Sequence, residues 1–382
     1  MDKLQKLQHL TEKMHLEPAE DAGCPKLAAP SRKSEKIVLS QAVLPNGKRI
    51  SLLKSLLTSA CERNCYYCPF RAGRDFRRAT FNPEEFAGIF MNLDRAGLAQ
   101  GVFLSSGVVA GGVHTQEKLI DTAEILRLKK GYRGYIHLKI MPGAERTQVE
   151  RAMQLADRLS VNLEAPNSHR LGLLAPGKMF VEELIRPLRW IDEIRRTLPS
   201  HSGWQGRWPS STTQFVVGGA GESDLELITT SQHLYRKLGL GRVYYSRFNP
   251  VPDTPLENTP AASPQREHRL YQASFLLRDY GFEPEELRFD PEGNLPLDID
   301  PKLAWAKDNL SHTPLEINRA SRHELLRVPG IGPKSAQAII NIRRQQVLGD
   351  LSTLYKLGIT ASRAAPFIIM NGMRPEFQLT LF

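Results

Sequence analysis

The chain has 382 residues, of which 41% are hydrophobic, and this length and composition suit one large folded domain with a smaller one. Its formal net charge of +10 favours a polyanionic partner, although charge alone does not separate DNA, RNA and the ribosome. No apolar stretch approaches the ~18 residues of a membrane span, and the first residues lack the pattern of a signal peptide. We therefore expect a cytoplasmic protein that does not enter a membrane.

Residues 1–49 are interpreted as an N-terminal extension. They begin with leucines at a helical spacing, continue through a segment rich in Pro, Ala, Ser and Lys, and end near a Pro-Asn-Gly turn at 45–47. This extension contains Cys24, one of only four cysteines, so the chain does not depend on disulfides and suits a reducing compartment. We interpret Cys24 as an ordinary thiol rather than a metal ligand.

From residue 50 onward, short apolar runs alternate with segments of helical periodicity. The predicted strands are 51–58, 101–106, 135–140, 160–164, 213–218 and 242–248. The predicted helices are 83–96, 115–130, 146–158, 179–198, 223–238 and 264–280. Six successive strand-helix units imply parallel strands joined by right-handed crossovers, and hence an α/β sheet or barrel.

Residues that start and stop helices support these boundaries. Asn82 stands before a proline and two glutamates, which is typical of a helix N-cap. Gly131, Gly239 and Gly281 stand where helices are expected to end. Pro187 interrupts the fourth predicted helix, which we expect either to kink there or to begin late.

Three cysteines follow the first predicted strand in the segment CERNCYYC, where Cys61, Cys65 and Cys68 are separated by three and then two residues. Three such thiolates can bind three irons of a four-iron, four-sulfur cluster and leave the fourth iron open. Zinc usually takes paired Cys or His sets, and no second pair stands nearby. A disulfide would leave one thiol over. We predict the cluster and keep zinc, or a purely structural cluster, as alternatives.

This spacing, with Tyr66 and Tyr67 before the last cysteine, resembles the radical S-adenosylmethionine (SAM) superfamily. The resemblance implies a six-unit partial (β/α) barrel with the cluster loop after its first strand. It also implies that the open iron of a [4Fe-4S] cluster chelates S-adenosyl-L-methionine, and that reduction of the cluster cleaves SAM to a 5′-deoxyadenosyl radical. An electron donor such as flavodoxin or ferredoxin is implied as a partner. The catalytic side chains themselves stay unassigned.

The resemblance also implies SAM contacts at the other strand ends. Residues 105–107 take the place of the glycine-rich segment that holds the methionine part, without the family glutamate, and Asn162 and Glu164 are placed for the ribose hydroxyls. The motif implied on the adenine side falls at residues 217–222. The glycine that would precede it is replaced by Phe215. The expected contacts are Tyr67, Ser105, Ser106, Gly107, Asn162, Glu164, Val217, Gly219 and Glu222. Other polar side chains near strand ends, His114, Lys139 and His169, are interpreted as solvated or hydrogen-bonded.

The segment just beyond the cysteines interleaves arginines with Phe76 and Phe81. Guanidinium groups pair with phosphates and aromatic rings stack on unpaired bases, so this segment is a candidate nucleic-acid lip beside the cluster. A solvated loop is the alternative. The candidate arginines are Arg71, Arg74, Arg77 and Arg78.

A second module begins at about residue 314, after a connector rich in proline and acidic residues that has one helical segment at 302–309. Residues 317–345 predict two helices joined by a tight turn, with Ser321 and Glu324 as a capping box. In the turn, two glycines around an isoleucine let the backbone approach a polyanion, and the next helix presents N–H groups to a phosphate. The candidate phosphate contacts are Gly330, Ile331, Gly332 and Lys334.

This unit resembles the helix-hairpin-helix DNA-binding motif, and residues 350–369 resemble its second half, with Thr360 departing from the pattern. Over 312–382, nine basic residues stand against four acidic ones. The basic residues are Arg319, Arg322, Arg327, Lys334, Arg343, Arg344, Lys356, Arg363 and Arg374. Such hairpins grip phosphates rather than base edges, so the module is expected to bind DNA without reading its sequence. A role in protein interaction is the alternative.

Taken together, the cluster segment, barrel and hairpin resemble a bacterial family of radical SAM proteins assigned to DNA modification or repair. The resemblance implies a partner similar to uracil-DNA glycosylase. We therefore predict an α/β protein, a six-unit partial (β/α) barrel followed by a small all-α helix-hairpin-helix domain, that modifies or repairs DNA by radical SAM chemistry. The alternatives are the same chemistry on tRNA or rRNA, and a DNA-binding protein with a structural or redox cluster.

The last five residues, Gln378–Phe382, follow a chain-breaking segment and read QLTLF. They resemble the pentapeptide by which bacterial proteins bind the replicative sliding clamp, with apolar anchors inserted into a preformed pocket. A tail folded back on its own domain is the alternative. The predicted organisation is an extension (1–49), the barrel (50–281), the connector (282–313), the hairpin domain (314–372) and the tail (373–382).

Overall fold

The computed structural model describes residues 2–12, 14, 37–43 and 47–376. Cys24 and the tail Gln378–Phe382 lie outside the described residues. The chain divides into two units, one made of Met1–Glu222 and His233–Glu267 and the other of Ser223–Gln232 and His268–Phe382. Within the described ranges, no helix is both long enough and apolar enough to cross a membrane.

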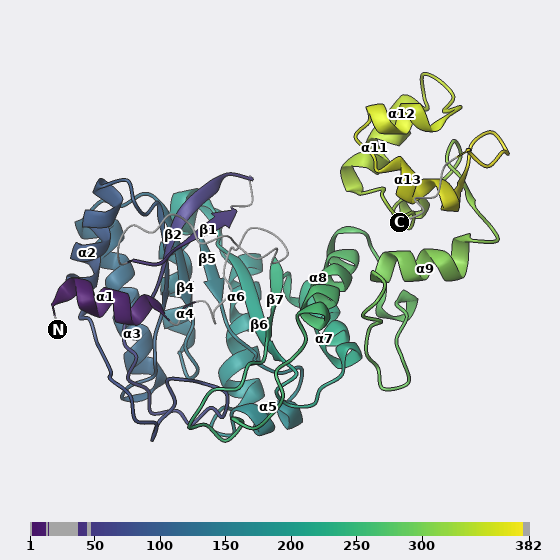
Figure 1. The fold of residues 1–382 in the computed structure, drawn as a ribbon. Helices are drawn as coiled ribbons and strands as arrows, with labels where there is room; N and C mark the ends of the chain where they lie inside the picture. The colour runs from purple at the N-terminus through teal and green to yellow at the C-terminus, as the bar shows by residue number, and fades with distance from the viewer. Residues whose placement is uncertain (1, 13, 15–36, 44–46, 377–382) are drawn as a thin grey trace. The chain divides into compact units, whose positions relative to one another are not determined.

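A seven-stranded sheet forms the centre of the first unit, with its strands in sequence order (Figure 1). The strands are β1 (Leu39–Val43), β2 (Arg49–Leu56), β3 (Gly101–Ser105), β4 (Tyr135–Lys139), β5 (Arg158–Ser160), β6 (Ser210–Val217) and β7 (Arg242–Arg247). From β2 to β7 every neighbouring pair is parallel. The predicted six-unit α/β partial barrel is confirmed, because sequential parallel strands need a crossover between each pair.

Helices fill most of these crossovers. The α-helices up to the end of the sheet region are α1 (Lys3–Glu12), α2 (Pro83–Arg95), α3 (Gly111–Glu124), α4 (Arg146–Leu155), α5 (Ser168–Leu174), α6 (Arg186–Thr197), α7 (Asp224–Leu238) and α8 (Pro264–Asp279). Two π-helical turns, η2 (Ile125–Lys129) and η3 (Phe180–Ile185), and two 3₁₀ turns, η4 (Ser200–Ser202) and η5 (Trp204–Gly206), adjoin them.

The residues predicted to start and end helices do so in the structure. The Asn82 side chain accepts a hydrogen bond from the Glu85 N–H at 2.7 Å and caps α2. Gly131 and Gly239 take φ values of 67° and 55°, the left-handed conformation that glycine adopts easily. The break expected at Pro187 appears as a π-helical turn that ends at Ile185, after which α6 begins with the proline in its first turn.

Three local predictions differ from the structure. β1 lies within the segment interpreted as an extension and pairs antiparallel with β2, and its five residues are too few for a clear alternation. β5 covers 158–160 rather than 160–164, because the chain leaves regular strand geometry and Glu164 takes a positive φ of 64°. α5 has no apolar stripe long enough to predict it, but the Asn167 side chain caps it by accepting from the Arg170 N–H.

The second unit contains the helical module. Its further elements are η6 (Pro284–Glu286), α9 (Pro301–Leu310), β8 (Leu315–Glu316), α10 (Arg322–Leu325), α11 (Pro333–Ile342), α12 (Leu351–Lys356), α13 (Ala361–Ala364), η7 (Ala365–Phe367) and β9 (Ile368–Ile369). The predicted capping box is present, since Ser321 and Glu324 exchange hydrogen bonds between side chain and backbone. Val328, Ile331 and Ile359 are buried in one apolar core, so both hairpins are anchored from within.

The loop after β3 lies directly on the cysteine segment. The Leu57 N–H donates to the Ser105 carbonyl, and the Gly107 N–H donates to the Thr58 carbonyl, both at 2.8 Å. A Cβ atom on Gly107 would lie 2.0 Å from the carbonyl oxygen of Ala60, a backbone atom that cannot rotate away. Only glycine therefore fits at position 107, for a reason of packing that is independent of any ligand.

We predict that Gly107→Ala destabilises the first unit by about 1–3 kcal/mol, because its methyl group forces two backbone segments apart. Thermal unfolding followed by circular dichroism measures this as a lower Tm. Gly88→Ala is the matched control, since Gly88 lies in α2 with open space around its Cβ position. That change is expected to stabilise the helix by up to ~1 kcal/mol. Equal Tm values for Gly107→Ala and the unchanged protein would contradict the packing argument.

Candidate functional site

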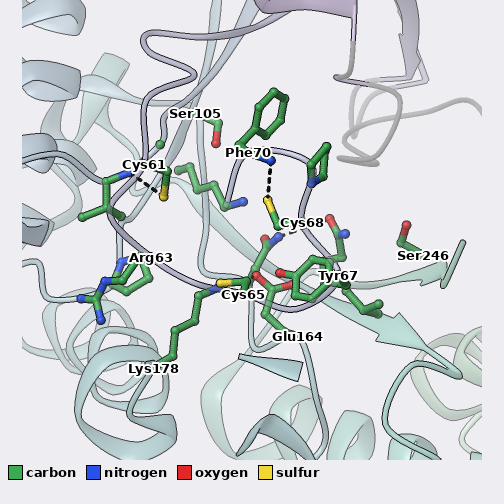
Figure 2. Close-up of a pocket in the computed structure, with 18 of the residues that line it drawn as sticks. Cys61, Arg63, Cys65, Tyr67, Cys68, Phe70, Ser105, Glu164, Lys178 and Ser246 are labelled. Carbon is green, nitrogen blue, oxygen red and sulfur yellow. Dashed lines mark hydrogen bonds and ion pairs between the residues drawn. The ribbon is translucent and has the colours of Figure 1, made fainter. Parts of the chain in front are cut away.

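A cavity lies at the carboxyl ends of the parallel strands, which is where α/β folds place ligand sites. Figure 2 shows side chains from the cysteine segment and from several strand ends pointing into it. Nine of the residues predicted from the sequence line it. They are Cys61, Cys65, Tyr67, Cys68, Ser105, Ser106, Gly107, Asn162 and Glu164. The fold thus gathers residues that are spread over about a hundred positions of the chain.

The three cysteines are free thiols, and backbone N–H groups point at two of them. The Val108 N–H donates to Cys61 Sγ and the Phe70 N–H donates to Cys68 Sγ, each at 3.4 Å. Burial raises the pKa of the Cys65 thiol and that of the Cys68 thiol. Buried thiols of this kind become thiolates when a cation binds them, so the site suits metal ligation coupled to proton release.

A four-iron cluster and a single zinc ion need different arrangements of the three cysteines. Tetrahedral zinc requires its ligands to converge on one ion. A four-iron cluster does not, because each cysteine binds a different iron.

A buried charged network adjoins the cysteines. Lys178 Nζ lies 2.9 Å from Glu164 Oε1, and the two side chains are only 10% and 4% exposed. The Tyr67 hydroxyl donates to the same carboxylate. Burial alone would raise the pKa of Glu164, but the charges of Lys178 and Lys139 outweigh it and hold that pKa below its usual value. The carboxylate is therefore ionised in the cavity.

Two lysines of this network lie outside the predicted site residues. Lys139, which the sequence predicts to be solvated or hydrogen-bonded, lines the cavity with 8% exposure. Lys178 was not singled out, since it lies in a short connection between α5 and η3 with no motif around it. Only the close packing of distant segments brings Lys178 to the cysteines. His114 and His169, by contrast, are exposed as expected.

The segment that carries Lys178 is fastened to the cysteine segment. Arg63 donates to the Gly177 carbonyl and, at 2.6 Å, to the Glu183 carboxylate. The Tyr66 N–H donates to the Leu174 carbonyl at 2.7 Å. These contacts join residues more than a hundred positions apart, so they hold the two loops in one rigid arrangement.

The SAM segment predicted after β3 offers the donor and acceptor groups that a polar ligand needs. Ser106 Oγ is buried and has no hydrogen-bond partner among the described residues. Buried hydroxyls are normally hydrogen-bonded, so this atom fits a polar group bound in the cavity. Asn162 and Glu164 supply an amide and a carboxylate from the next wall. The residues present thus fit SAM on the methionine and ribose sides.

The expected adenine-side residues are placed elsewhere. Val217, Gly219 and Glu222 are not among the residues that line the cavity, whereas Gln214 and Val216 of the same strand are. Glu222 accepts hydrogen bonds from the Gly218 and Ala220 N–H groups and so shapes its own turn. A Cβ on Gly219 would lie 2.8 Å from the Leu174 side chain, so a larger residue would require Leu174 to shift.

The arginines after the cysteines divide into two groups. Arg78 donates to the carbonyls of Ser59, Phe70, Arg71 and Arg74, and Arg74 donates to the carbonyls of Pro252 and Pro69. Both guanidinium groups thus hold loops together, which corrects their interpretation as phosphate ligands. Arg77 is exposed, and Arg71 stacks over Tyr66 with a buried Nε that has no hydrogen-bond partner among the described residues.

The hairpin glycines also have packing roles. Gly330 has a φ of 82°, and a Cβ on it would lie 2.7 Å from the Thr360 carbonyl oxygen of the second hairpin. A Cβ on Gly332 would lie 3.3 Å from the Tyr280 hydroxyl. Substituting Gly330 would disturb the second unit itself, so this residue is a poor probe of DNA contact. Ile331 is buried, and Lys334 is the exposed member of the predicted set.

Several of the basic residues counted in this module are used internally. Arg327 is bound to Glu286 and to two carbonyls, Arg343 donates to the carbonyls of Ile317 and Ala320, and Arg363 pairs with Asp300. Arg374 donates to the Ser311 carbonyl. The remaining five are exposed or partly exposed and are Arg319, Arg322, Lys334, Arg344 and Lys356. The sequence count therefore overestimates the cationic groups available to a polyanion.

Comparison with known proteins identifies both modules. The radical SAM superfamily model matches residues 55–234, and the helix-hairpin-helix motif model matches residues 311–361. No curated protein matches the chain.

Solved structures similar to this chain include the FeFe-hydrogenase maturase HydG from Carboxydothermus hydrogenoformans (16% identity, 59% of this chain, 51% of that one, TM-score 0.46). Methylornithine synthase, PylB, has 16% identity over 59% of this chain and 62% of its own, with a TM-score of 0.47. The radical SAM methyltransferase TsrM from Kitasatospora setae has 12% identity over 54% of this chain and 38% of its own, with a TM-score of 0.39. The matched region thus spans about half the length of these proteins.

The family matches agree with the cavity and with the hairpin described above. The chain therefore carries a radical SAM domain, the domain of enzymes that use a [4Fe-4S] cluster and SAM, together with a C-terminal helix-hairpin-helix motif.

Proposed function

We propose that this protein is a radical SAM enzyme that modifies or repairs DNA. The observation that carries the proposal is the presence, on one chain, of a cysteine-lined cavity at the barrel's strand ends and a helix-hairpin-helix motif. The first module supplies radical chemistry, and the second supplies affinity for a phosphate backbone.

In this proposal Cys61, Cys65 and Cys68 each bind one iron. The Val108 and Phe70 N–H groups donate to Cys61 and Cys68 and would stabilise the negative charge of these two thiolates. When bound, the cluster and SAM would supply a 5′-deoxyadenosyl radical for hydrogen abstraction. The segment 105–107 would hold the methionine side of SAM and polar groups after β5 its ribose side, with Tyr67 keeping the Glu164 carboxylate oriented.

DNA binding is assigned to the first hairpin. The first turn of α11 leaves backbone N–H groups unpaired within the helix, and exposed Lys334 stands beside them. Such contacts are to phosphates and carry no base information. RNA remains the first alternative substrate, since the same contacts suit both backbones. A purely structural cluster is the second, although structural clusters use four nearby cysteines and this segment supplies three.

Three protein partners belong to the same proposal. A low-potential electron donor such as flavodoxin or ferredoxin would supply the electron, and a protein similar to uracil-DNA glycosylase would act in the same process. The sliding clamp would bind the tail Gln378–Phe382. The tail lies outside the described residues, so the clamp proposal is supported by its sequence alone.

The proposal is tested by incubating the reconstituted, reduced protein anaerobically with SAM and defined damaged or modified DNA, and with matched RNA. We expect 5′-deoxyadenosine to form and the DNA to change in mass, with DNA preferred over RNA. A fully loaded cluster that yields no 5′-deoxyadenosine with either polymer would favour the structural cluster. A product on RNA alone would favour the RNA-modifying enzyme.

Replacing Cys61, Cys65 or Cys68 with alanine is predicted to abolish SAM cleavage and leave the barrel folded, because each change removes the ligand of one iron. The triple variant should lose the broad iron–sulfur absorbance near roughly 400 nm. Cys24→Ala is the control and should keep both the absorbance and SAM cleavage. Retention of the absorbance in the triple variant would show that these are not the ligands.

Lys334→Met is predicted to weaken duplex binding across all sequences and to lower the slope of log affinity against log salt by about one, because one phosphate contact is lost. Fluorescence anisotropy at several salt concentrations measures both quantities. Lys307→Met, an exposed lysine on α9 outside the hairpin, is the control and should leave the slope unchanged. An unchanged slope for Lys334→Met would remove this residue from the DNA contact.

Deletion of residues 378–382 is predicted to abolish binding of the purified clamp. Binding to the full-length protein should be micromolar, on the order of −8 kcal/mol, since a short apolar segment in a preformed pocket supplies most of it. Isothermal titration calorimetry measures the affinity, and DNA binding by the truncated protein is the control. No detectable clamp binding by the full-length protein would refute the proposed interaction.

A further inference from the structure

Lys178 is a largely buried cation that extends toward Cys65. It lines the same cavity as Cys65 and Cys68, and Figure 2 shows its side chain extending toward Cys65 and Glu164. Its side chain is 10% exposed, so water screens its charge weakly. Burial disfavours the charged amine, but the ion pair with Glu164 outweighs burial and raises the pKa of Lys178, so the amine stays protonated.

The backbone around Lys178 is held rigidly, so this charge has a fixed position. The Lys178 N–H donates to the Ala175 carbonyl at 3.0 Å, and the Met179 N–H donates to the Glu183 carboxylate at 2.8 Å. Arg63, which lies between the first two cysteines, donates to both Gly177 and Glu183. Lys178 and the cysteine segment therefore form one preorganised unit rather than two independent loops.

The charges that act on the cluster position come from three elements. Lys178 comes from the connection after α5, Glu164 from the segment after β5, and Lys139 from the end of β4. Lys178 and Glu164 form an ion pair, and Lys139 also attracts the carboxylate. Two cations thus surround one carboxylate beside the three thiol groups. An excess of positive charge favours any change that makes the cluster more negative.

We propose that Lys178 raises the reduction potential of the [4Fe-4S] cluster and that Glu164 opposes it. Reduction transfers one electron from a low-potential one-electron donor to the cluster, breaks no bond and moves no proton. The added negative charge is stabilised by the buried ammonium group and destabilised by the carboxylate. Lys178 is thus a positioning and tuning residue for the electron transfer that precedes radical formation. The inference rests on the cluster and is independent of the DNA substrate.

The test is a redox titration of the reconstituted protein without SAM or DNA, with titanium(III) citrate as reductant and the electron paramagnetic resonance signal of the reduced cluster as readout. Glu164→Gln should raise the ratio of reduced to oxidised cluster at a fixed potential. Adding Lys178→Met to that variant should lower the ratio about tenfold, which is 59 mV for one electron. Starting from the Glu164→Gln variant avoids leaving a buried carboxylate unpaired when the lysine is removed.

Two further variants serve as controls. Lys178→Arg keeps the charge and should keep the ratio of reduced to oxidised cluster near that of the unchanged protein. Lys129→Met removes an exposed lysine paired with Glu84, away from the cavity, and should leave the ratio unchanged. Iron and sulfide content confirms that each variant is loaded. Equal ratios for Glu164→Gln and the double variant would overturn the proposal. If the double variant takes up no iron, an unchanged ratio in Glu164→Gln alone would overturn it.

Discussion

The candidate site depends on the close packing of the cysteine segment against two other parts of the chain. On one side, Gly107 lets the loop after β3 lie against Ala60 with no room for a side chain. On the other, Arg63 binds Gly177 and Glu183 and holds the loop after α5 in place. Three thiols in a flexible loop would bind a cluster weakly, because ordering them would cost conformational entropy. Packing on both sides removes most of that cost before anything binds.

The same packing sets the electrostatics of the cavity. Bringing Lys178 and Glu164 out of water is costly unless each finds a partner, and their 2.9 Å ion pair with the added Tyr67 hydrogen bond provides it. Lys139 leaves the site with more cationic than anionic side chains before the cysteines are counted. The folded protein therefore places cationic side chains beside the three thiol groups.

In the second unit, buried residues of both hairpins contribute to one apolar core. Gly330 packs on the Thr360 carbonyl, and Arg327 and Arg343 donate to backbone carbonyls within the unit. Much of the positive charge in this region thus stabilises the fold. The charge that remains exposed, including Lys334, is the part available for phosphates. A count of basic residues in the sequence does not separate side chains that stabilise the fold from side chains that can bind phosphates.

Sequence patterns were sufficient for the features that depend on neighbours along the chain: the parallel sheet, the caps at Asn82 and Ser321, and the cysteine segment that locates the cavity. These follow from local hydrogen bonding and periodicity, which nearby residues encode.

Contacts between distant segments could not be obtained in this way. Lys178 comes from a short connection without a motif, and contacts between distant segments, such as those of Arg63 with Gly177 and Glu183, bring it to the cysteines. In the sequence, Arg78 resembles a phosphate ligand. In the structure, its guanidinium group donates to four backbone carbonyls. Whether a charged side chain faces a ligand, a partner charge or a backbone carbonyl is decided by tertiary packing, because burial and distance determine the strength of each interaction.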